Sequence, residues 1–178
     1  LVCFMMKIRL GISACLLGQE VRYDGRHKLD RFLVETLGPH VEYVPVCPEV
    51  ECGLGVPREA MRLVGDPKAP RLMTQVTRED LTPRMQDWIA CRLKALEKER
   101  LCGFIFKSKS PSCGMERVAV HNEKGDVVGD APGLFVRAVM ERFPLLPVED
   151  EGRLSDPEVR ESFVERIFAG QHYLQPHP

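Results

Sequence analysis

The stretch Ile8-Arg9-Leu10-Gly11-Ile12-Ser13-Ala14-Cys15 decides the fold, because a short and largely apolar run ends here at a cysteine. Its residues Ile8 to Ala14 predict a strand. Asp30 predicts the N-cap of a helix from Arg31 to Leu37, and the β-branched run Val41 to Val46 predicts a second strand. A strand, a helix and a strand in this order favour parallel strands. We therefore expect a single α/β domain with a largely parallel, Rossmann-like sheet flanked by helices.

Apolar periodicity predicts the elements that follow. The clearest helix runs from Asp80 to Arg100, since its apolar side chains fall on one face at 3.6-residue spacing. These side chains are Leu81, Met85, Trp88, Ile89, Leu93 and Leu96. The other predicted strands are Arg71 to Val76, Cys102 to Phe106, Val118 to His121, Val127 to Val128 and Leu145 to Val148, and the other helices are Leu134 to Phe143 and Asp156 to Phe168. The stretch from Cys47 to Pro70 shows no regular pattern.

Composition limits the class of protein. The chain has 178 residues with a formal net charge of −1, which excludes a bulk electrostatic footprint for nucleic acid. No apolar run approaches the ~20 residues that span a bilayer. Seven cysteines, an odd number, come without a signal peptide, so we expect a reducing cytoplasm and thiols that bind metal or react.

Three of the cysteines share one position relative to the predicted sheet. Cys15 ends the first strand, Cys47 ends the second, and Cys113 lies in the loop after the third. Ligands bind at the carboxyl ends of parallel strands, so these thiols are expected to converge. Three thiolates leave one position open, as in a zinc ion with a free site or a [4Fe–4S] cluster with a free iron; three reduced core cysteines without metal are the alternative. We expect Cys91 and Cys102 to be buried, and leave Cys52 undecided.

Polar residues surround the three cysteines. Glu49 follows Cys47 at the spacing that places both side chains on one side of an extended segment, where a carboxylate can transfer protons; a surface glutamate is the alternative. The run Lys107 to Gly114 can hold an anion such as a nucleotide phosphate, unless it is an ordinary solvated loop. The loop from Arg22 to His27 and the side chain of Arg58 offer similar contacts.

Several of these segments together resemble one family. In fixed order they are Ser13-Ala14-Cys15-Leu16-Leu17-Gly18, Arg22-Tyr23-Asp24-Gly25, Val46-Cys47-Pro48-Glu49, Gly53-Leu54-Gly55-Val56-Pro57-Arg58 and Lys107 to Gly114. This set resembles the thiouracil desulfidase family over roughly Lys7 to Glu149. We therefore expect residues 7–150 to form the desulfidase domain, after an N-terminal extension at 1–6 and before a C-terminal helix and tail at 151–178.

The resemblance implies an oxygen-sensitive [4Fe–4S] cluster held by Cys15, Cys47 and Cys113 alone. The fourth iron would bind the sulfur of a thiocarbonyl, and family members release hydrogen sulfide from thiouracil or 4-thiouridine. Glu49 would be the general acid and base. The residues expected to contact substrate are Ser110, Ser112, Lys107, Lys109, Arg22, Asp24 and Arg58.

The segment Arg153 to Arg166 carries a second resemblance, to the sequence that joins this domain to a second one in longer relatives. Those relatives are associated with removal of 4-thiouridine from tRNA, whereas this sequence ends at Pro178; a truncated chain, a split protein and a single-domain form stay open. The expected partner is therefore a thiolated pyrimidine as free base, nucleotide or tRNA residue. Two other functions stay open: a nucleic-acid-binding module with a structural metal, and a metal-free persulfide sulfur-relay protein.

Overall fold

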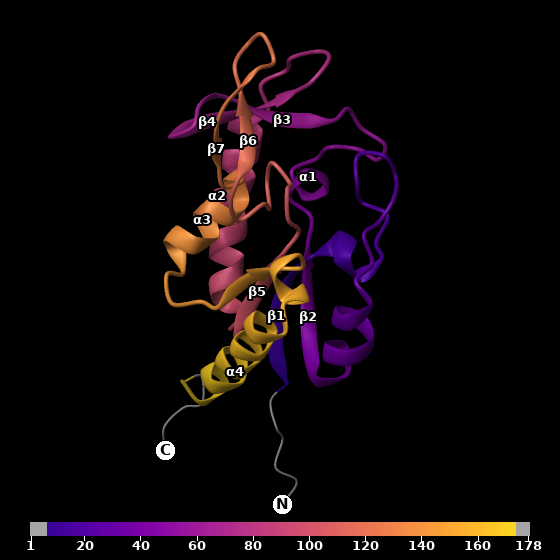
Figure 1. Ribbon diagram of the computed structural model, residues 1–178, viewed down its shortest axis with the longest axis vertical. Helices are drawn as coiled ribbons and strands as arrows, with labels where there is room; N and C mark the ends of the chain where they lie inside the picture. The colour runs from indigo at the N-terminus through magenta and orange to yellow at the C-terminus, as the bar shows by residue number, and fades with distance from the viewer. Residues whose placement is uncertain (1–6, 174–178) are drawn as a thin grey trace, which may run out of the picture.

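The computed structural model describes residues 7–173. The predicted extension at 1–6, with Cys3, and the end of the predicted tail at 174–178 lie outside the described residues. Figure 1 shows two sheets, a parallel one in the lower half of the view and a second one at the top, with helices α2 and α3 running between them. Within this described part, no helix is both long enough and apolar enough to span a bilayer.

The parallel sheet confirms the expected fold class. Its strands are β1 (Ile8–Ser13), β2 (Val41–Val46), β5 (Gly103–Phe106) and β8 (Val148–Asp150), in the order β2-β1-β5-β8 with every neighbouring pair parallel. The predicted connection between the first two strands contains a π-helix (Phe32–Leu37), and the Leu33 N–H donates to Asp30 Oδ1 at 3.1 Å. Asp30 thus caps the helix as predicted.

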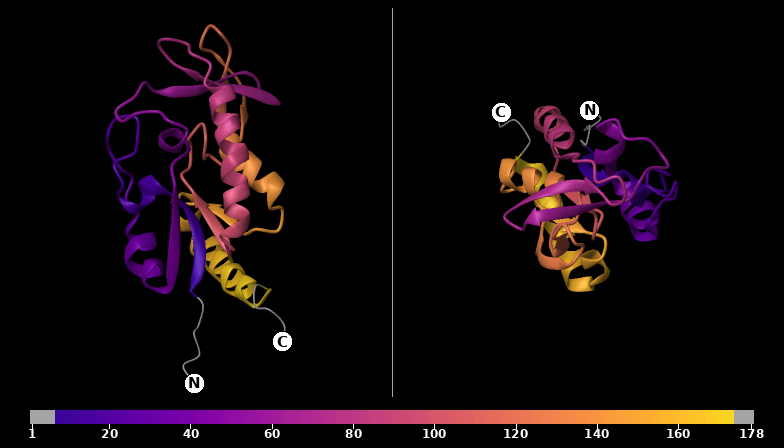
Figure 2. Two further views of the ribbon diagram at one scale, coloured as in Figure 1. Left: turned by 180° about the vertical axis from the view of Figure 1, so that it is seen from behind. Right: turned by 90° about the horizontal axis from the view of Figure 1, so that it is seen from above.

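Helices cover both faces of the parallel sheet. They are α1 (Pro48–Glu51), α2 (Thr82–Lys98), α3 (Leu134–Arg142) and α4 (Pro157–Tyr173), with short 3-10 turns at Ala14–Leu17, Gly38–His40 and Arg153–Ser155. Phe104 and Phe106 pack in one core cluster with α2 and α3, whereas Ile105 packs in another with α4 and the π-helix. The alternation follows from the two-residue period of a strand and gives three layers, which Figure 2 shows from two further directions.

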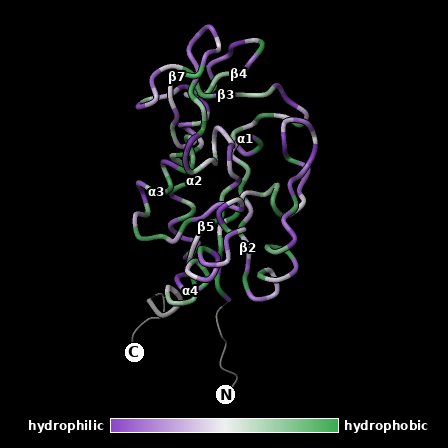
Figure 3. The backbone as a smooth tube through the Cα atoms, viewed as in Figure 1, coloured by the Kyte–Doolittle hydropathy of each residue, from purple (hydrophilic) through white to green (hydrophobic). Residues whose placement is uncertain are grey.

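A second, mixed sheet was not predicted, although three of its four strands lie at or near predicted strands. Its strands are β3 (Met61–Asp66), β4 (Ala69–Thr74), β6 (Val118–His121) and β7 (Val127–Ala131), in the order β4-β3-β6-β7. Only β3 and β6 pair in parallel. Leu63 and Leu72 are fully buried and extend the core around α2 and α3. The loops at the outer end of this sheet are largely hydrophilic (Figure 3).

Several boundaries and one burial prediction were wrong. The last strand was predicted at Leu145 to Val148 but begins at Val148, because the chain turns there with Leu145 95% exposed. The final helix extends to Tyr173 instead of ending at Phe168. Cys91 is exposed because it lies off the apolar stripe of α2, whereas Cys102 is buried as expected. The stripe itself is confirmed, since Met85, Ile89 and Leu96 are buried.

Candidate active site

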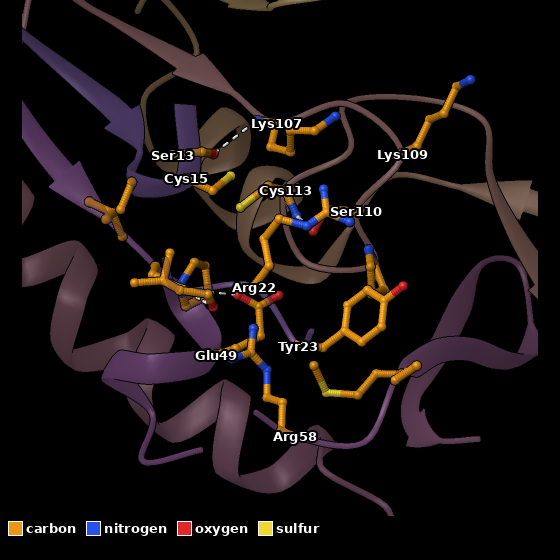
Figure 4. A pocket seen from close by; sticks show the side chains of 18 of the residues that line it. Ser13, Cys15, Arg22, Tyr23, Glu49, Arg58, Lys107, Lys109, Ser110 and Cys113 are labelled. Atoms are coloured by element: carbon orange, nitrogen blue, oxygen red, sulfur yellow. Dashed lines mark hydrogen bonds between the residues drawn. The ribbon is translucent and has the colours of Figure 1, made fainter. Parts of the chain in front are cut away.

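A cavity of about 410 Å³ lies at the carboxyl ends of the parallel strands. Sequence-predicted residues from distant parts of the chain line it together (Figure 4). They are Cys15, Arg22, Cys47, Glu49, Arg58, Lys107, Lys109, Ser110 and Cys113. The expected convergence of segments after β1, β2 and β5 on one cavity is therefore present.

The backbone fixes Cys15 and Cys47 where β1 and β2 end. Cys15 lies in the 3-10 turn after β1, and its carbonyl accepts a hydrogen bond from Lys28 N–H at 2.9 Å. Cys47 is the N-cap of α1, and its N–H donates to Glu51 Oε2 at 2.8 Å. Glu51 is held in turn by Arg92 on α2, whose Nε lies 3.3 Å from Oε1. Both thiols are free.

The N-terminus of α3 holds the loop that carries Cys113. The first N–H groups of a helix lack partners within the helix, and here Phe135 and Val136 donate theirs to the carbonyl of Ser112, at 3.0 and 3.1 Å. At Gly133 a Cβ would lie 2.4 Å from the carbonyl carbon of Ser112, so only glycine permits this approach. Cys113 is buried and free, and Figure 4 shows its sulfur close to that of Cys15.

Burial keeps the three thiols protonated. It raises the pKa of Cys15 to about 11, although Lys107 nearby opposes the rise. Burial, with the neighbouring carboxylate of Glu49, raises the pKa of Cys47 to about 12 and holds that of Cys113 well above its usual range. A protonated thiol is a poor nucleophile, whereas a bound metal displaces the proton. The arrangement therefore favours metal coordination over a persulfide relay.

Glu49 lies between two of the cysteines and is not a surface glutamate. It is only 8% exposed, and its Oε2 lies 3.5 Å from Cys47 Sγ. Its Oε1 accepts a hydrogen bond from Ser112 Oγ, which also lies 3.7 Å from Cys113 Sγ. Ser112 Oγ is 3.0 Å from Ser110 Oγ. A carboxylate and two hydroxyls thus form one hydrogen-bonded chain beside the thiols.

The donor set suits an iron–sulfur cluster, because a [4Fe–4S] cluster is held by cysteine thiolates, each on a different iron. Cys15, Cys47 and Cys113 offer thiolates alone and follow the ends of three separate strands. These residues therefore fit a [4Fe–4S] cluster.

Cys52 lies outside the cavity lining. Its thiol is 3.3 Å from the carbonyl oxygen of Glu49 and packs against the apolar core. This placement weighs against Cys52 as a fourth ligand and against a closed, structural metal site.

The charged residues predicted to contact substrate differ in whether they line the cavity or lie outside it. Arg22 and Arg58 line the cavity, and the Nε atoms of both are buried without a hydrogen-bond partner among the described residues. Asp24 does not line the cavity; its Oδ1 accepts from Arg26 N–H at 3.1 Å and lies 3.7 Å from Arg22 Nε, so it shapes the loop. Lys109 stands exposed at the rim and points away from Cys15 and Cys113 (Figure 4).

Lys107 lines the cavity, but its ammonium is held by the protein. It forms an ion pair with Glu151 and donates to the carbonyl oxygen and to the Oγ of Ser108, at 2.9 and 3.1 Å. Sequence reasoning missed Glu151, which follows β8. It also missed Ser13, whose Oγ accepts from the Lys107 N–H at 2.9 Å. The signal for Ser13 was its position in the motif that leads into Cys15.

Three further lining residues were given no individual role from the sequence. Tyr23, in the loop after β1, is 44% exposed, and the guanidinium carbon of Arg22 lies 5.7 Å from the centre of its ring. Met61 begins β3 and Gln75 follows β4, so the unpredicted second sheet supplies the opposite wall.

Comparisons with known proteins agree with this geometry. The solved structure of a [4Fe-4S]-dependent thiouracil desulfidase, TudS, is similar with a TM-score of 0.69 and 28% identity, over 89% of this chain and 99% of that one. The uncharacterized protein YbbK of Bacillus subtilis (strain 168) is 30% identical over 108 residues, which are 58% of this chain and 71% of YbbK. A family model described as 2-thiouracil desulfurase matches residues 10–151. The chain belongs to the 2-thiouracil desulfurase family.

Proposed function

We propose that this chain is a [4Fe–4S]-dependent desulfidase that hydrolyses the C=S bond of a thiolated uracil. The reaction adds water and releases hydrogen sulfide, leaving the oxo base, with no net electron transfer. One observation carries the proposal: three thiols from three strand ends share a cavity with a buried carboxylate that lies beside two of them. The domain that performs the reaction spans residues 7–150. Its free thiols and oxygen-sensitive cofactor suit the reducing cytoplasm.

Cys15, Cys47 and Cys113 would hold the cluster. When bound, it supplies a thiophilic, Lewis-acidic iron that selects the soft sulfur of a thiocarbonyl over the hard oxygen of a carbonyl. The protein provides the ligands from rigid positions, since Cys47 is tied to α2 through Glu51 and Cys113 to α3 through Ser112.

Glu49 is the residue that moves protons in this proposal. Its carboxylate takes a proton from the water that adds to the thiocarbonyl carbon, and returns it to the departing sulfur. The hydroxyl of Ser112 donates to Oε1 and so orients the carboxylate, while Ser110 extends the hydrogen-bonded chain to the cavity wall. Burial of Glu49 keeps bulk water from competing for this proton.

The lining favours an anionic substrate. The guanidinium groups of Arg22 and Arg58 line the cavity and carry positive charge that an anion can neutralise. A thiolated uracil nucleotide supplies such an anion through its phosphate, which arginine binds well. We therefore propose the nucleotide as the preferred substrate, over the free base and 4-thiouridine in tRNA.

The test is anaerobic reconstitution of the chain with iron and sulfide. The product should be brown and should release sulfide from 4-thiouridine 5′-monophosphate, with weaker turnover of 4-thiouracil. Aerobically purified protein should be partly colourless and inactive. A cluster-loaded protein that releases no sulfide from any thiopyrimidine, including 4-thiouridine in tRNA, would contradict the proposed activity.

A further inference from the structure

The carboxylate of Glu151 accepts three hydrogen bonds from residues beside the cavity. It follows β8, next to the end of β5 in the parallel sheet. One oxygen, Oε1, accepts from Lys107 Nζ and from Ser108 Oγ, the latter at 2.8 Å. The other, Oε2, accepts from the Ser108 N–H at 2.7 Å. A single carboxylate thus binds both the side chains and the backbone at the start of the loop that carries Cys113.

The ammonium of Lys107 has no donor left for a substrate. A lysine has three N–H donors, and these are matched by Glu151, the carbonyl oxygen of Ser108 and the Oγ of Ser108. The side chains of Lys107 and Glu151 are only 18% and 17% exposed. A phosphate could reach Lys107 only by displacing one of these partners.

The same network continues to a proposed cluster ligand. The N–H of Lys107 donates to Ser13 Oγ at 2.9 Å, and Ser13 lies close enough to Cys113 to lower the pKa of its thiol, against the larger effect of burial. Lys107 is also close enough to Cys15 to act on its thiol electrostatically, more strongly than Glu151 does. Glu151 is therefore connected to both cysteines, although it touches neither.

We infer that Glu151 is a positioning residue that fixes Lys107 and Ser108 at the start of the Cys113 loop. Lys107 then acts as a fixed positive charge beside the cysteines and not as a contact for the phosphate of a substrate. This inference rests on the proposed function, because the charge acts on Cys15, one of the three cysteines that would hold the cluster. It leaves the binding of an anion to Arg22 and Arg58.

The first test measures the midpoint potential of the reconstituted cluster in two variants. Lys107→Gln removes a positive charge and should make the potential more negative, whereas Glu151→Gln removes a negative charge and should make it more positive. Glu151→Asp, which keeps the charge, should stay near the wild type. Glu97→Gln is the control, because Glu97 pairs with Arg142 at an exposed site outside the cavity lining. A potential that does not change in Lys107→Gln would overturn the inference, because Lys107 would then not act as a charge beside the cluster.

The second test separates a fixed charge from a phosphate contact. In Lys107→Gln, kcat should fall by about 10- to 100-fold on both 4-thiouracil and 4-thiouridine 5′-monophosphate, the usual effect of an outer-sphere change at a metal site. The ratio of the two KM values should not change. A KM that rises for the nucleotide alone would show that Lys107 binds phosphate and would overturn the inference.

The third test needs no cluster and so is independent of the proposed activity. In cluster-free protein, amide hydrogen exchange at Ser108 should quicken in Glu151→Gln, since its N–H loses a charged acceptor. Exchange in β1 should stay slow, which shows that the variant is folded. Unchanged exchange at Ser108 would refute the positioning role, whereas wild-type protein that binds no cluster would refute the proposed function instead.

Discussion

The two sheets of this protein differ in burial and in what they contribute to the cavity. In the parallel sheet, β5 is buried at every residue and β1 at all but one, and the segments after β1, β2 and β5 carry the cysteines. In the second sheet, β7 is largely exposed, and the contribution is a wall that includes Met61 and Gln75. The difference indicates that reactive groups stand on the sheet that is covered on both faces, where the backbone holds them most rigidly.

The largest expected effect follows from removing the thiols of the parallel sheet. Cys15→Ala, Cys47→Ala and Cys113→Ala should each reduce iron content and bring sulfide release to background, because each removes one of the three proposed ligands. Iron, acid-labile sulfide and turnover are measured on anaerobically reconstituted protein. Cys91→Ala is the matched control, since Cys91 is exposed on α2 outside the cavity. Full activity in any of the three variants would show that its thiol is not a ligand.

Glu49→Gln should separate catalysis from cluster binding. The amide can still accept the hydrogen bond from Ser112 but cannot take a proton, so iron content should be retained while kcat falls by about 10²- to 10⁴-fold. The measurement is steady-state sulfide release alongside the visible spectrum of the cluster. If iron were lost together with activity, Glu49 would have a role in holding the cluster.

Leu72→Ala tests whether the second sheet is only a scaffold. Leu72 on β4 is fully buried, so its truncation should lower the free energy of unfolding by about 2–5 kcal/mol. Urea unfolding gives that loss. At a temperature where the variant is still folded, iron content and kcat should match the wild type. A selective loss of kcat would mean that the second sheet does more than shape the wall.

Gly133→Ala should disturb the cavity by displacing the loop that follows β5 and carries Cys113. Its Cβ would lie 2.5 Å from the carbonyl oxygen of Ser112 and 2.9 Å from the backbone nitrogen of Cys113, so the loop must shift. We expect a loss of about 1–3 kcal/mol in the free energy of unfolding, together with reduced iron content.

Gly170→Ala is the control for that variant. Gly170 lies in α4, and the nearest atom to its added Cβ is the carbonyl oxygen of Cys102 at 3.9 Å, an ordinary contact. Alanine should therefore be neutral or stabilise the helix by up to about 1 kcal/mol. Equal effects of the two substitutions would show that the close approach at Gly133 does not matter.

The parallel sheet could be predicted from sequence because its signals are local. Largely apolar runs such as Ile8 to Ala14 indicate buried strands, and a cysteine at the end of each of two strands then indicates convergence. Strand β3 gave no such signal. Its residues Met61–Asp66 contain polar side chains and a glycine, and the strand is stabilised by pairing with β6, far along the chain.

Glu151 was missed from the sequence for a more specific reason. The last strand was predicted to end at Val148, which leaves Glu151 in a loop beyond the sheet, whereas the strand begins there and runs to Asp150. This shift places Glu151 directly at the carboxyl edge beside Lys107. Strand boundaries depend on pairing between strands and not on local pattern, so a carboxylate at such an edge cannot be located from its neighbours in sequence.

The smallest expected effect is the pH dependence that Glu151, at the edge of the parallel sheet, gives to the free energy of unfolding. Burial alone would raise the pKa of its carboxyl, but the hydrogen bonds from Lys107 and Ser108 outweigh burial and lower it. A carboxyl whose pKa is lower in the folded state stabilises that state above the pKa of the unfolded chain, about 4.3, and loses this contribution as pH falls through the folded pKa.

In cluster-free protein, the difference in the free energy of unfolding between wild type and Glu151→Gln should therefore be present at pH 7 and should shrink below about pH 4. It should be about 1 kcal/mol or less, because solvent reaches the ion pair. Urea unfolding across this range measures it. A difference that is constant with pH would mean that the charge of Glu151 contributes nothing and that only its shape holds the Cys113 loop.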